Sequence, residues 1–201
     1  MLPTNVRRLH PRPTSAPLHG VDSQGFKDAM RQLASGVCVV TVGAGDERNG
    51  LTATSVSSLS DEPPTLLVCV HRAASSYPAF ERYGAFAVNV LAADQREIAD
   101  RFAGATNAGG AGRFAGGRWL ELPDGGVCLA ESVAVLDCEV EERIERHSHA
   151  IVIGRVRRTM IGANSGALVY WRGRYDQIGW TDAEVARAVG LSPRIGAFSP
   201  T

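Results

Sequence analysis

The feature that most constrains this sequence is a succession of short, β-branched apolar runs broken by glycine and proline. The segments Val37–Val42 and Thr65–His71 are the clearest of these runs, and their composition is typical of buried strands. The runs do not alternate regularly with crossover helices, so a doubly wound parallel sheet is disfavoured. The pattern predicts roughly seven or eight strands and three or four short helices, and it favours a small closed antiparallel barrel with peripheral helices.

Element boundaries follow from the same patterns. Phe26, Met30 and Leu33 recur at helical spacing after Ser23, which is available as an N-cap. The segment Asp94–Glu97 has the acid-x-x-Glu spacing of a second helix N-terminus. Further helices are expected at residues 77–83 and 184–189. Strands are expected at residues 37–42, 51–59, 65–71, 86–91, 127–140, 150–156, 167–171 and 175–178.

The chain of 201 residues suits one domain with a full hydrophobic core. Residues 1–22 are expected to form a disordered tail, residues 23–180 the folded domain and residues 181–201 a C-terminal extension. The formal net charge is zero. No global positive field therefore draws the protein to nucleic acid or to an anionic membrane.

The cysteines indicate a reducing compartment. None of Cys38, Cys69, Cys128 and Cys138 belongs to a C-x-x-C pair, and three of them lie in apolar, strand-like runs. This pattern is typical of buried, reduced thiols in a cytosolic protein. No apolar run approaches the ~18 residues that a membrane helix needs. The cytoplasm is therefore the expected location.

Several familiar catalytic motifs are absent. A dinucleotide fingerprint beginning at Gly43 fails because Arg48 stands where its third glycine belongs. The chain has no Gly-Lys-Ser/Thr phosphate loop and no Gly-x-Ser-x-Gly elbow. His147 and His149 have strand spacing, but no obvious third ligand accompanies them, so no metal site is expected.

The segment Leu51–Ser60 is unusual for a strand because Ser and Thr dominate it and small residues fill the gaps. Small side chains let a flat ligand approach the backbone closely, and hydroxyls can meet the polar atoms of a ring or phosphate. An exposed polar edge strand would have the same composition. Composition alone therefore leaves both interpretations open.

The order of several segments resembles the short-chain flavin reductase family, whose members are reductase components of two-component flavin-dependent monooxygenases. The resemblance covers roughly residues 24–180. Its three leading segments are Gly36–Thr41, Gly50–Ser60 and Pro63–Val70. The later pieces are Ser75-Ser76, Phe86–Leu91, Arg101–Ala103, His149 with Gly154–Val156, and Leu168–Tyr170 with Gly173 and Tyr175.

The resemblance implies a mainly β fold with peripheral helices, namely an antiparallel, Greek-key split β-barrel of the FMN-binding type that binds flavin at a homodimer interface. It also implies a set of flavin-binding residues. For several of them a plainer role stays open: a helix cap for Ser75, a solvated charge for Arg101, and satisfied backbone groups for Asn89. The implied set is Thr52, Ala53, Thr54, Ser55, Ser57, Cys69, Val70, His71, Ser75, Ser76, Asn89 and Arg101.

The nicotinamide site is implied to involve His149 and Tyr175. Related reductases have a Gly-Asp-His triplet before this strand, whereas this chain has His147-Ser148-His149. The histidine is kept and the acid is lost, which could change the tautomer or charge of the ring. A surface loop histidine is the plainer alternative.

The function implied is an NAD(P)H:flavin oxidoreductase. Hydride would pass from nicotinamide C4 to flavin N5 without a protein nucleophile or base, and reduced flavin would diffuse to a partner oxygenase. Two alternatives stay open: a non-catalytic flavin-binding module, and an oxidase of the pyridoxamine phosphate oxidase type. The sequence does not distinguish FMN from FAD or NADH from NADPH.

Overall fold

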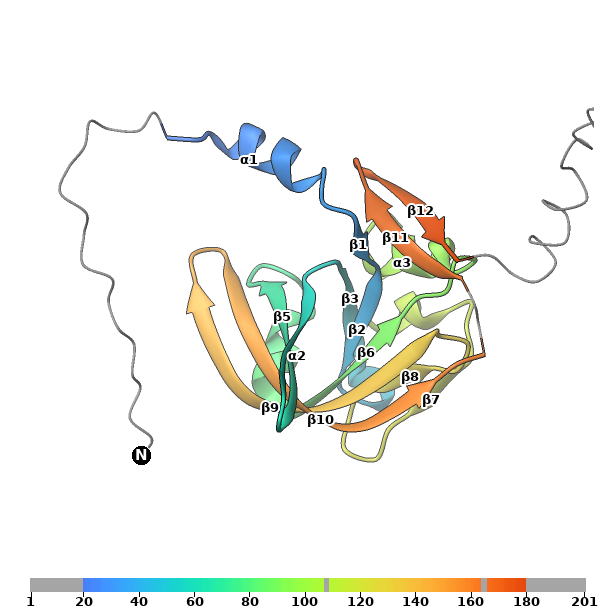
Figure 1. The fold of residues 1–201 in the computed structure, drawn as a ribbon. Helices are drawn as coiled ribbons and strands as arrows, with labels where there is room; N and C mark the ends of the chain where they lie inside the picture. The colour runs from blue at the N-terminus through green and yellow to red at the C-terminus, as the bar shows by residue number, and fades with distance from the viewer. Residues whose placement is uncertain (1–19, 107–108, 164–165, 180–201) are drawn as a thin grey trace, which may run out of the picture.

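The computed structural model describes residues 20–106, 109–163 and 166–179, and it is mainly antiparallel β (Figure 1). The expected fold class is confirmed. One large sheet carries the core, and its neighbours in space are mostly distant in sequence. Its strands pair in the order β3 (Asn49–Ala53), β2 (Cys38–Val42), β6 (Ala85–Val90), β9 (Ala134–Arg146), β10 (His149–Ile161), β5 (Pro64–His71) and β4 (Val56–Asp61).

Two small sheets and short helices surround this sheet. The small sheets are β1 (Ser35–Gly36), β11 (Ala167–Trp171) and β12 (Arg174–Ile178), and the pair β7 (Trp119–Glu121) and β8 (Val127–Leu129). The helices are α1 (Ser23–Met30), α2 (Tyr77–Arg82) and α3 (Arg96–Phe102), with 3-10 turns at Gly45–Glu47 and Gly110–Phe114. None of the described helices is both long and apolar enough to cross a membrane. The helix expected at 184–189 lies outside the described residues.

The prediction of a single strand at residues 51–59 is wrong. The chain breaks at Thr54–Ser55, and the parts on either side become β3 and β4, the two opposite edges of the large sheet. The sheet therefore curves until its two edges are joined by this short link, which we call the seam. Edge strands have backbone groups that no neighbouring strand uses. The seam thus brings two such edges together.

Other boundaries differ because side-chain contacts override local patterns. Asp22, not Ser23, caps α1, since its Oδ1 accepts a hydrogen bond from Gly25 N at 2.6 Å. The helix predicted to begin at Asp94 starts after Gln95, whose side chain accepts from Ala92 N. Residues 127–140, which were expected to contain a strand, include β8 and the first part of β9. Strand β7 was not predicted.

The core fills the inside of the curved sheet. Val68 and Val152 on the neighbouring strands β5 and β10 are fully buried, as is Phe86 on β6. A Cβ at Gly154 would lie 2.5 Å from Phe86 Cζ, so only glycine leaves room for this ring. A second cluster packs α3 against the barrel. The expected burial of Cys38, Cys128 and Cys138 is confirmed, and all four thiols, including half-buried Cys69, are free.

Candidate functional site

A cleft of about 550 Å³ lies between α1 and the seam. Helix α1 projects from the barrel above this region (Figure 1), and none of its residues is buried. The cleft combines an apolar helix face, two cationic side chains and a hydroxyl-rich link. Its lining residues are Phe26, Lys27, Met30, Arg31, Leu33, Ser35, Thr54, Ser55, Val56, Ser57 and Tyr170.

At the seam, one hydroxyl takes the place of a strand partner. Ser55 Oγ donates to Cys69 O at 3.1 Å and accepts from Cys69 N at 3.3 Å. This contact fixes the link beside β5 and leaves the exposed side chains of Thr54 and Ser57 on the cleft. Thr52 Oγ1 instead donates to Ala99 O of α3 at 2.6 Å. The Thr52 hydroxyl is therefore directed to the helix.

The start of β3 is held by close packing. A Cβ at Gly50 would lie 2.6 Å from Val40 O and 2.9 Å from Phe102 Cε1. Arg113 Nη1 donates to Gly50 O at 2.9 Å. Asn49 Nδ2 donates to Ser75 O at 3.2 Å, which ties β3 to the loop before α2. These contacts set the position of the seam.

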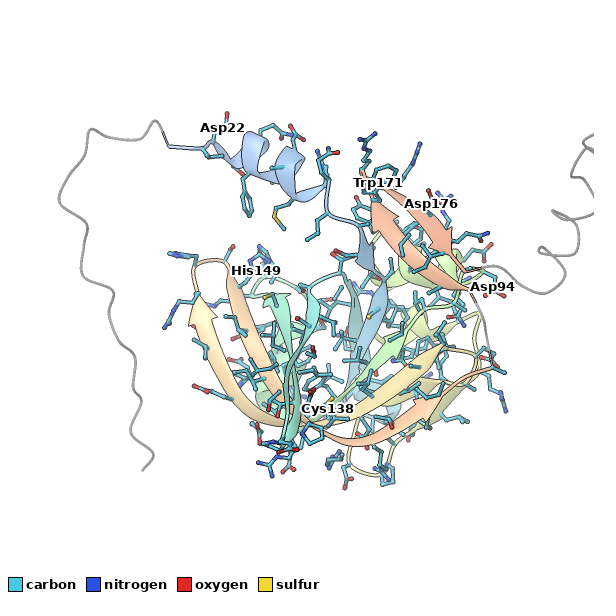
Figure 2. The ribbon with its side chains drawn as sticks, in the orientation of Figure 1. Asp22, Asp94, Cys138, His149, Trp171 and Asp176 are labelled. Carbon is cyan, nitrogen blue, oxygen red and sulfur yellow. The ribbon has the colours of Figure 1, made fainter. Side chains whose placement is uncertain are left out.

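Two histidines lie at the ends of neighbouring strands. In the β5–β10 pair, His71 is opposite His149 and Cys69 is opposite Ile151. Cross-strand partners share a face, so these four side chains lie on the outer face of the sheet. The rings of His71 and His149 meet edge to face with centroids 4.8 Å apart. Figure 2 shows His149 beside the turn that joins β9 to β10.

The hairpin that carries His149 is tied to the loop after β5. Arg72 N donates to Ser148 O at 2.9 Å, and the Arg72 guanidinium lies 3.1 Å from Glu145 Oε2. Tyr77 donates its hydroxyl to Glu145 Oε1 at 2.9 Å. Burial, followed by Glu145, raises the pKa of Tyr77, so the phenol remains a donor at neutral pH. The carboxylate thus joins the two segments that bear the histidines.

Ser148 stands beside His149 where a carboxylate would stand in a Gly-Asp-His triplet. Its Oγ lies 2.9 Å from His149 Nδ1. A hydroxyl can donate or accept, so it orients the ring without adding a negative charge. His147 occupies the left-handed region with φ 52°, as expected where a hairpin turn favours glycine. Within the described ranges, no three His, Cys, Asp or Glu side chains are grouped to hold a metal.

Comparison with known proteins decides the family. The family model described as flavin reductase like domain matches residues 30–179. The chain belongs to this family. The FMN reductase (NADH) RutF of Variovorax paradoxus (strain S110) is 35% identical over 178 residues, covering 89% of this chain and 97% of the relative.

Solved structures agree with this flavin reductase-like assignment. The NADH:FAD oxidoreductase of Streptomyces globisporus C-1027, in complex with NAD and FAD fragments, has a TM-score of 0.71 and 30% identity, covering 81% of this chain and 95% of that chain. BorF, the flavin reductase component of a bacterial two-component tryptophan halogenase, has a TM-score of 0.73 and 30% identity, covering 80% and 100%. The split-barrel fold is thus shared with these reductases.

Two of the residues expected to bind flavin, Asn89 and Val70, have fully buried side chains. Asn89 has no exposed surface. Its Nδ2 donates to Val39 O at 3.0 Å and Val127 O at 3.2 Å, and its Oδ1 accepts from Leu129 N at 2.7 Å. The Asn89 side chain therefore joins β6 to β2 and β8. This is the role of satisfying buried backbone groups that was the alternative to flavin binding. Val70 is also fully buried, with its side chain in the core, so only its backbone could meet a ligand.

The expected phosphate residues are only partly assembled. Ser75 is exposed next to α2, whereas Ser76 is buried; the Ser76 hydroxyl neither caps the helix nor has a hydrogen-bond partner among the described residues. Arg101 donates to Ala115 O, and its guanidinium packs against Gly116. The structure thus places Arg101 on the glycine-rich segment after α3. The helix cap considered for Ser75 is not formed either, because Ser76 occupies that position.

Tyr175 lies away from His149. Its ring meets Tyr170 edge to face, with centroids 5.5 Å apart, and the Arg96 guanidinium carbon lies 5.8 Å from its centroid. Burial, followed by the Asp100 charge, raises the pKa of Tyr175. Figure 2 shows the neighbouring Asp176 and His149 on opposite sides of the molecule. A single chain therefore does not bring the two expected nicotinamide residues together.

The cleft includes residues that sequence reasoning missed. Lys27, the only lysine of the chain, lines the cleft with Arg31 and Tyr170. A signal was available in the sequence, since the apolar face of α1 at Phe26 and Met30 needs a surface to cover it. Its direction toward the seam could be known only once the sheet had closed.

Proposed function

We propose that this chain is an NAD(P)H:flavin oxidoreductase that supplies reduced FMN or FAD to a partner monooxygenase. The observation that carries the proposal is the seam: two edge strands meet at Thr54–Ser55 beside a cleft, with His71 and His149 at the ends of the adjoining strands. A flat polar ring suits such a place because edge-strand backbone and hydroxyl groups can meet its nitrogens and carbonyls.

The residues that would hold the flavin lie along the seam. Thr54 and Ser55 would contact the isoalloxazine, with Ser57 beyond and the Cys69 side chain on the adjoining strand. Ala53 is buried in the core, so only its backbone would meet the ring. Lys27 adds positive charge to the cleft, beside Arg31, whose guanidinium is paired with Asp28 at 2.8 Å. The lysine would favour a reduced, anionic ring or a phosphate. Flavin supplies the hydride-accepting chemistry when bound. The protein's part is to orient the ring and exclude water above it.

The nicotinamide would approach from the end of β10. His149 is exposed there and held by Ser148 and by the Arg72–Glu145 link. No side chain in this region forms a nucleophile–base pair, and none is required for a hydride transfer between two bound rings. Tyr175 would join this site only from a second protomer.

The proposal includes a homodimer that completes the cleft. Phe26, Met30 and Leu33 on and just after α1 are exposed by 60%, 48% and 60%. The adjoining outer sheet face carries half-buried Cys69 and Ile151. An apolar helix face and an apolar sheet face around one cleft are typical of a surface covered by a partner. The charged Lys27 would then be enclosed with the ligand.

The oligomeric state of the protein in solution tests whether this dimer forms. Phe26→Asp combined with Met30→Asp is expected to give a monomer by analytical ultracentrifugation and to weaken flavin binding at least tenfold. Ile161→Asp is the matched control, because Ile161 is 81% exposed at the far end of β10 from His149. A wild-type monomer that binds flavin tightly would contradict the dimer and leave the reductase proposal standing.

Steady-state kinetics with each pairing of FMN or FAD with NADH or NADPH test the activity. Loss of reduced-nicotinamide absorbance should depend on added flavin, and one pairing should dominate. The absence of flavin-dependent oxidation in all four would overturn the proposal. Reduced flavin should also sustain a partner oxygenase. The cytoplasm is the proposed location, and fractionation of cells would check it.

A non-catalytic flavin-binding module is the second candidate. It is favoured by one observation, the replacement of Gly-Asp by His147-Ser148 before His149. Such a module would bind flavin and quench its fluorescence, but NADH would not bleach the bound flavin. An anaerobic titration with NADH separates the two candidates in one cuvette.

A further inference from the structure

We propose that His71 is a second nicotinamide-binding residue, and that it hydrogen-bonds the carboxamide group of the nicotinamide together with His149. This inference rests on the proposed reductase function and assigns the reductant contact to a pair of rings. Both side chains are exposed, His71 at the end of β5 and His149 at the start of β10. They come from directly opposed positions of β5 and β10, so they project from the same face.

The His71 ring has a fixed tautomer. Its Nδ1 accepts a hydrogen bond from Ala73 N at 3.0 Å. A backbone N–H can only donate, so Nδ1 carries the lone pair and the neutral ring carries its proton on Nε2. Within the described residues, Nε2 of His71 has no hydrogen-bond partner. His71 therefore presents one donor, oriented by its own loop.

The His149 ring contacts the hydroxyl of the residue before it in the chain. Ser148 Oγ lies 2.9 Å from its Nδ1, so when Nδ1–H donates to this hydroxyl, Nε2 is left as an acceptor. The ring centroids are 4.8 Å apart, so one amide group is large enough to bridge the two rings. With this tautomer of His149, the pair offers one donor and one acceptor.

A primary carboxamide has the complementary pattern. Its carbonyl oxygen would accept from His71 Nε2–H, and its NH₂ would donate to His149 Nε2. The other charged groups facing the pair come from the hairpin and the loop: Arg72 is occupied by Glu145 and by His147 O, and the Arg146 guanidinium donates to Glu145 O. Because these guanidinium groups already have partners, the histidine pair is the part of this surface that suits an amide.

The first test is a set of His71 variants in the full-length protein. His71→Ala should raise the KM for NADH about tenfold, as for the loss of one hydrogen bond to bound substrate, and leave kcat unchanged. His71→Phe keeps a ring against His149 without a donor and should behave like Ala. His71→Gln supplies an amide donor and should recover part of the affinity.

A substrate analogue separates the two contacts. The reduced acetylpyridine analogue of NADH keeps the carbonyl and lacks the NH₂ group. His71→Ala should still raise its KM, whereas His149→Ala should affect it much less than it affects NADH. His147→Asn is the control in the same turn, since asparagine tolerates the positive φ of that position, and its KM values should match wild type.

The possible outcomes test the histidine contact separately from the proposed reductase function. Wild-type turnover with an unchanged NADH KM in His71→Ala, or wild-type behaviour of His71→Phe, would overturn the contact and spare the reductase. Wild-type protein that neither oxidises NADH nor binds NAD⁺ in a calorimetric titration would overturn both.

Discussion

Ser55 and Cys69 are joined by two hydrogen bonds, because the serine hydroxyl both donates to the carbonyl of Cys69 and accepts its N–H. The side chain thus replaces a ladder partner at the point where the chain crosses between the two edges of the sheet. A main-chain neighbour would have continued β4 and closed the edge. The hydroxyl holds the link in place and leaves it accessible from the cleft.

Ser55→Ala should lower the free energy of unfolding by about 1–2 kcal/mol, because the half-buried polar groups of Cys69 lose their partner. It should also weaken flavin binding several-fold by releasing the seam. Urea unfolding and quenching of flavin fluorescence measure the two effects. Ser57→Ala is the control for the unfolding measurement, since the exposed Ser57 hydroxyl donates only to the adjacent Ser58 O in the described structure. An equal loss of stability in the two variants would contradict the role of Ser55.

Gly50→Ala should destabilise the protein by about 1–3 kcal/mol, because the added methyl group overpacks the start of β3. The new Cβ would lie 2.6 Å from Val40 O and 2.9 Å from a Phe102 ring atom, and backbone cannot move aside cheaply. Gly36→Ala is the matched control in a strand, with nothing within 4 Å of the new Cβ. Chemical unfolding of both variants checks the prediction, and a neutral Gly50→Ala would refute the packing argument.

Cys69 should be the one fast-reacting cysteine among the four when the native protein meets a thiol reagent. Burial raises the pKa of Cys38 and of Cys138 to about 12, and burial also raises the pKa of Cys128, so their thiolates are scarce at neutral pH. Cys69 is half-buried on the outer face. Time-resolved labelling should show one fast equivalent that vanishes in Cys69→Ser and that bound flavin protects. Fast labelling in Cys69→Ser would contradict the burial of the other thiols.

Stability should fall as the pH rises above about 9. The folded-state pKa of Cys38 is raised to about 12 by burial, so the folded state keeps a proton that the unfolded state releases earlier. The stabilisation is complete below the unfolded thiol pKa and is lost as pH rises toward the folded value, at up to about 1.4 kcal/mol per pH unit for each such thiol.

Urea midpoints at neutral pH and near pH 10 measure this loss. Cys38→Ala removes one contributing thiol and should show a shallower decline than wild type, whereas Cys69→Ser should decline like wild type. Parallel decline of all three proteins would show that buried thiols do not cause the pH dependence.

Much of the strand content could be predicted because it depends on local composition. The runs that became β5, β6 and β11 are short, apolar and bounded by turn residues, and their predicted limits differ from the observed ones by at most a residue or so. The caps were harder to predict. Asp22 and Ser23 are equally good N-caps by type, and only the contact with Gly25 N decides between them.

The sequence by itself determined the strand-rich class, the hydroxyl-rich character of the seam and the family. Only the tertiary structure decided that Thr54–Ser55 separates two strands at opposite sheet edges, because strand pairing over long sequence separation has no local signal. The same pairing placed His71 beside His149, put α1 over the cleft, and buried Asn89 in the core. The sequence states the chemical type of each side chain. The register between strands that are far apart in the sequence decides which face of the sheet that side chain occupies and which residues it contacts.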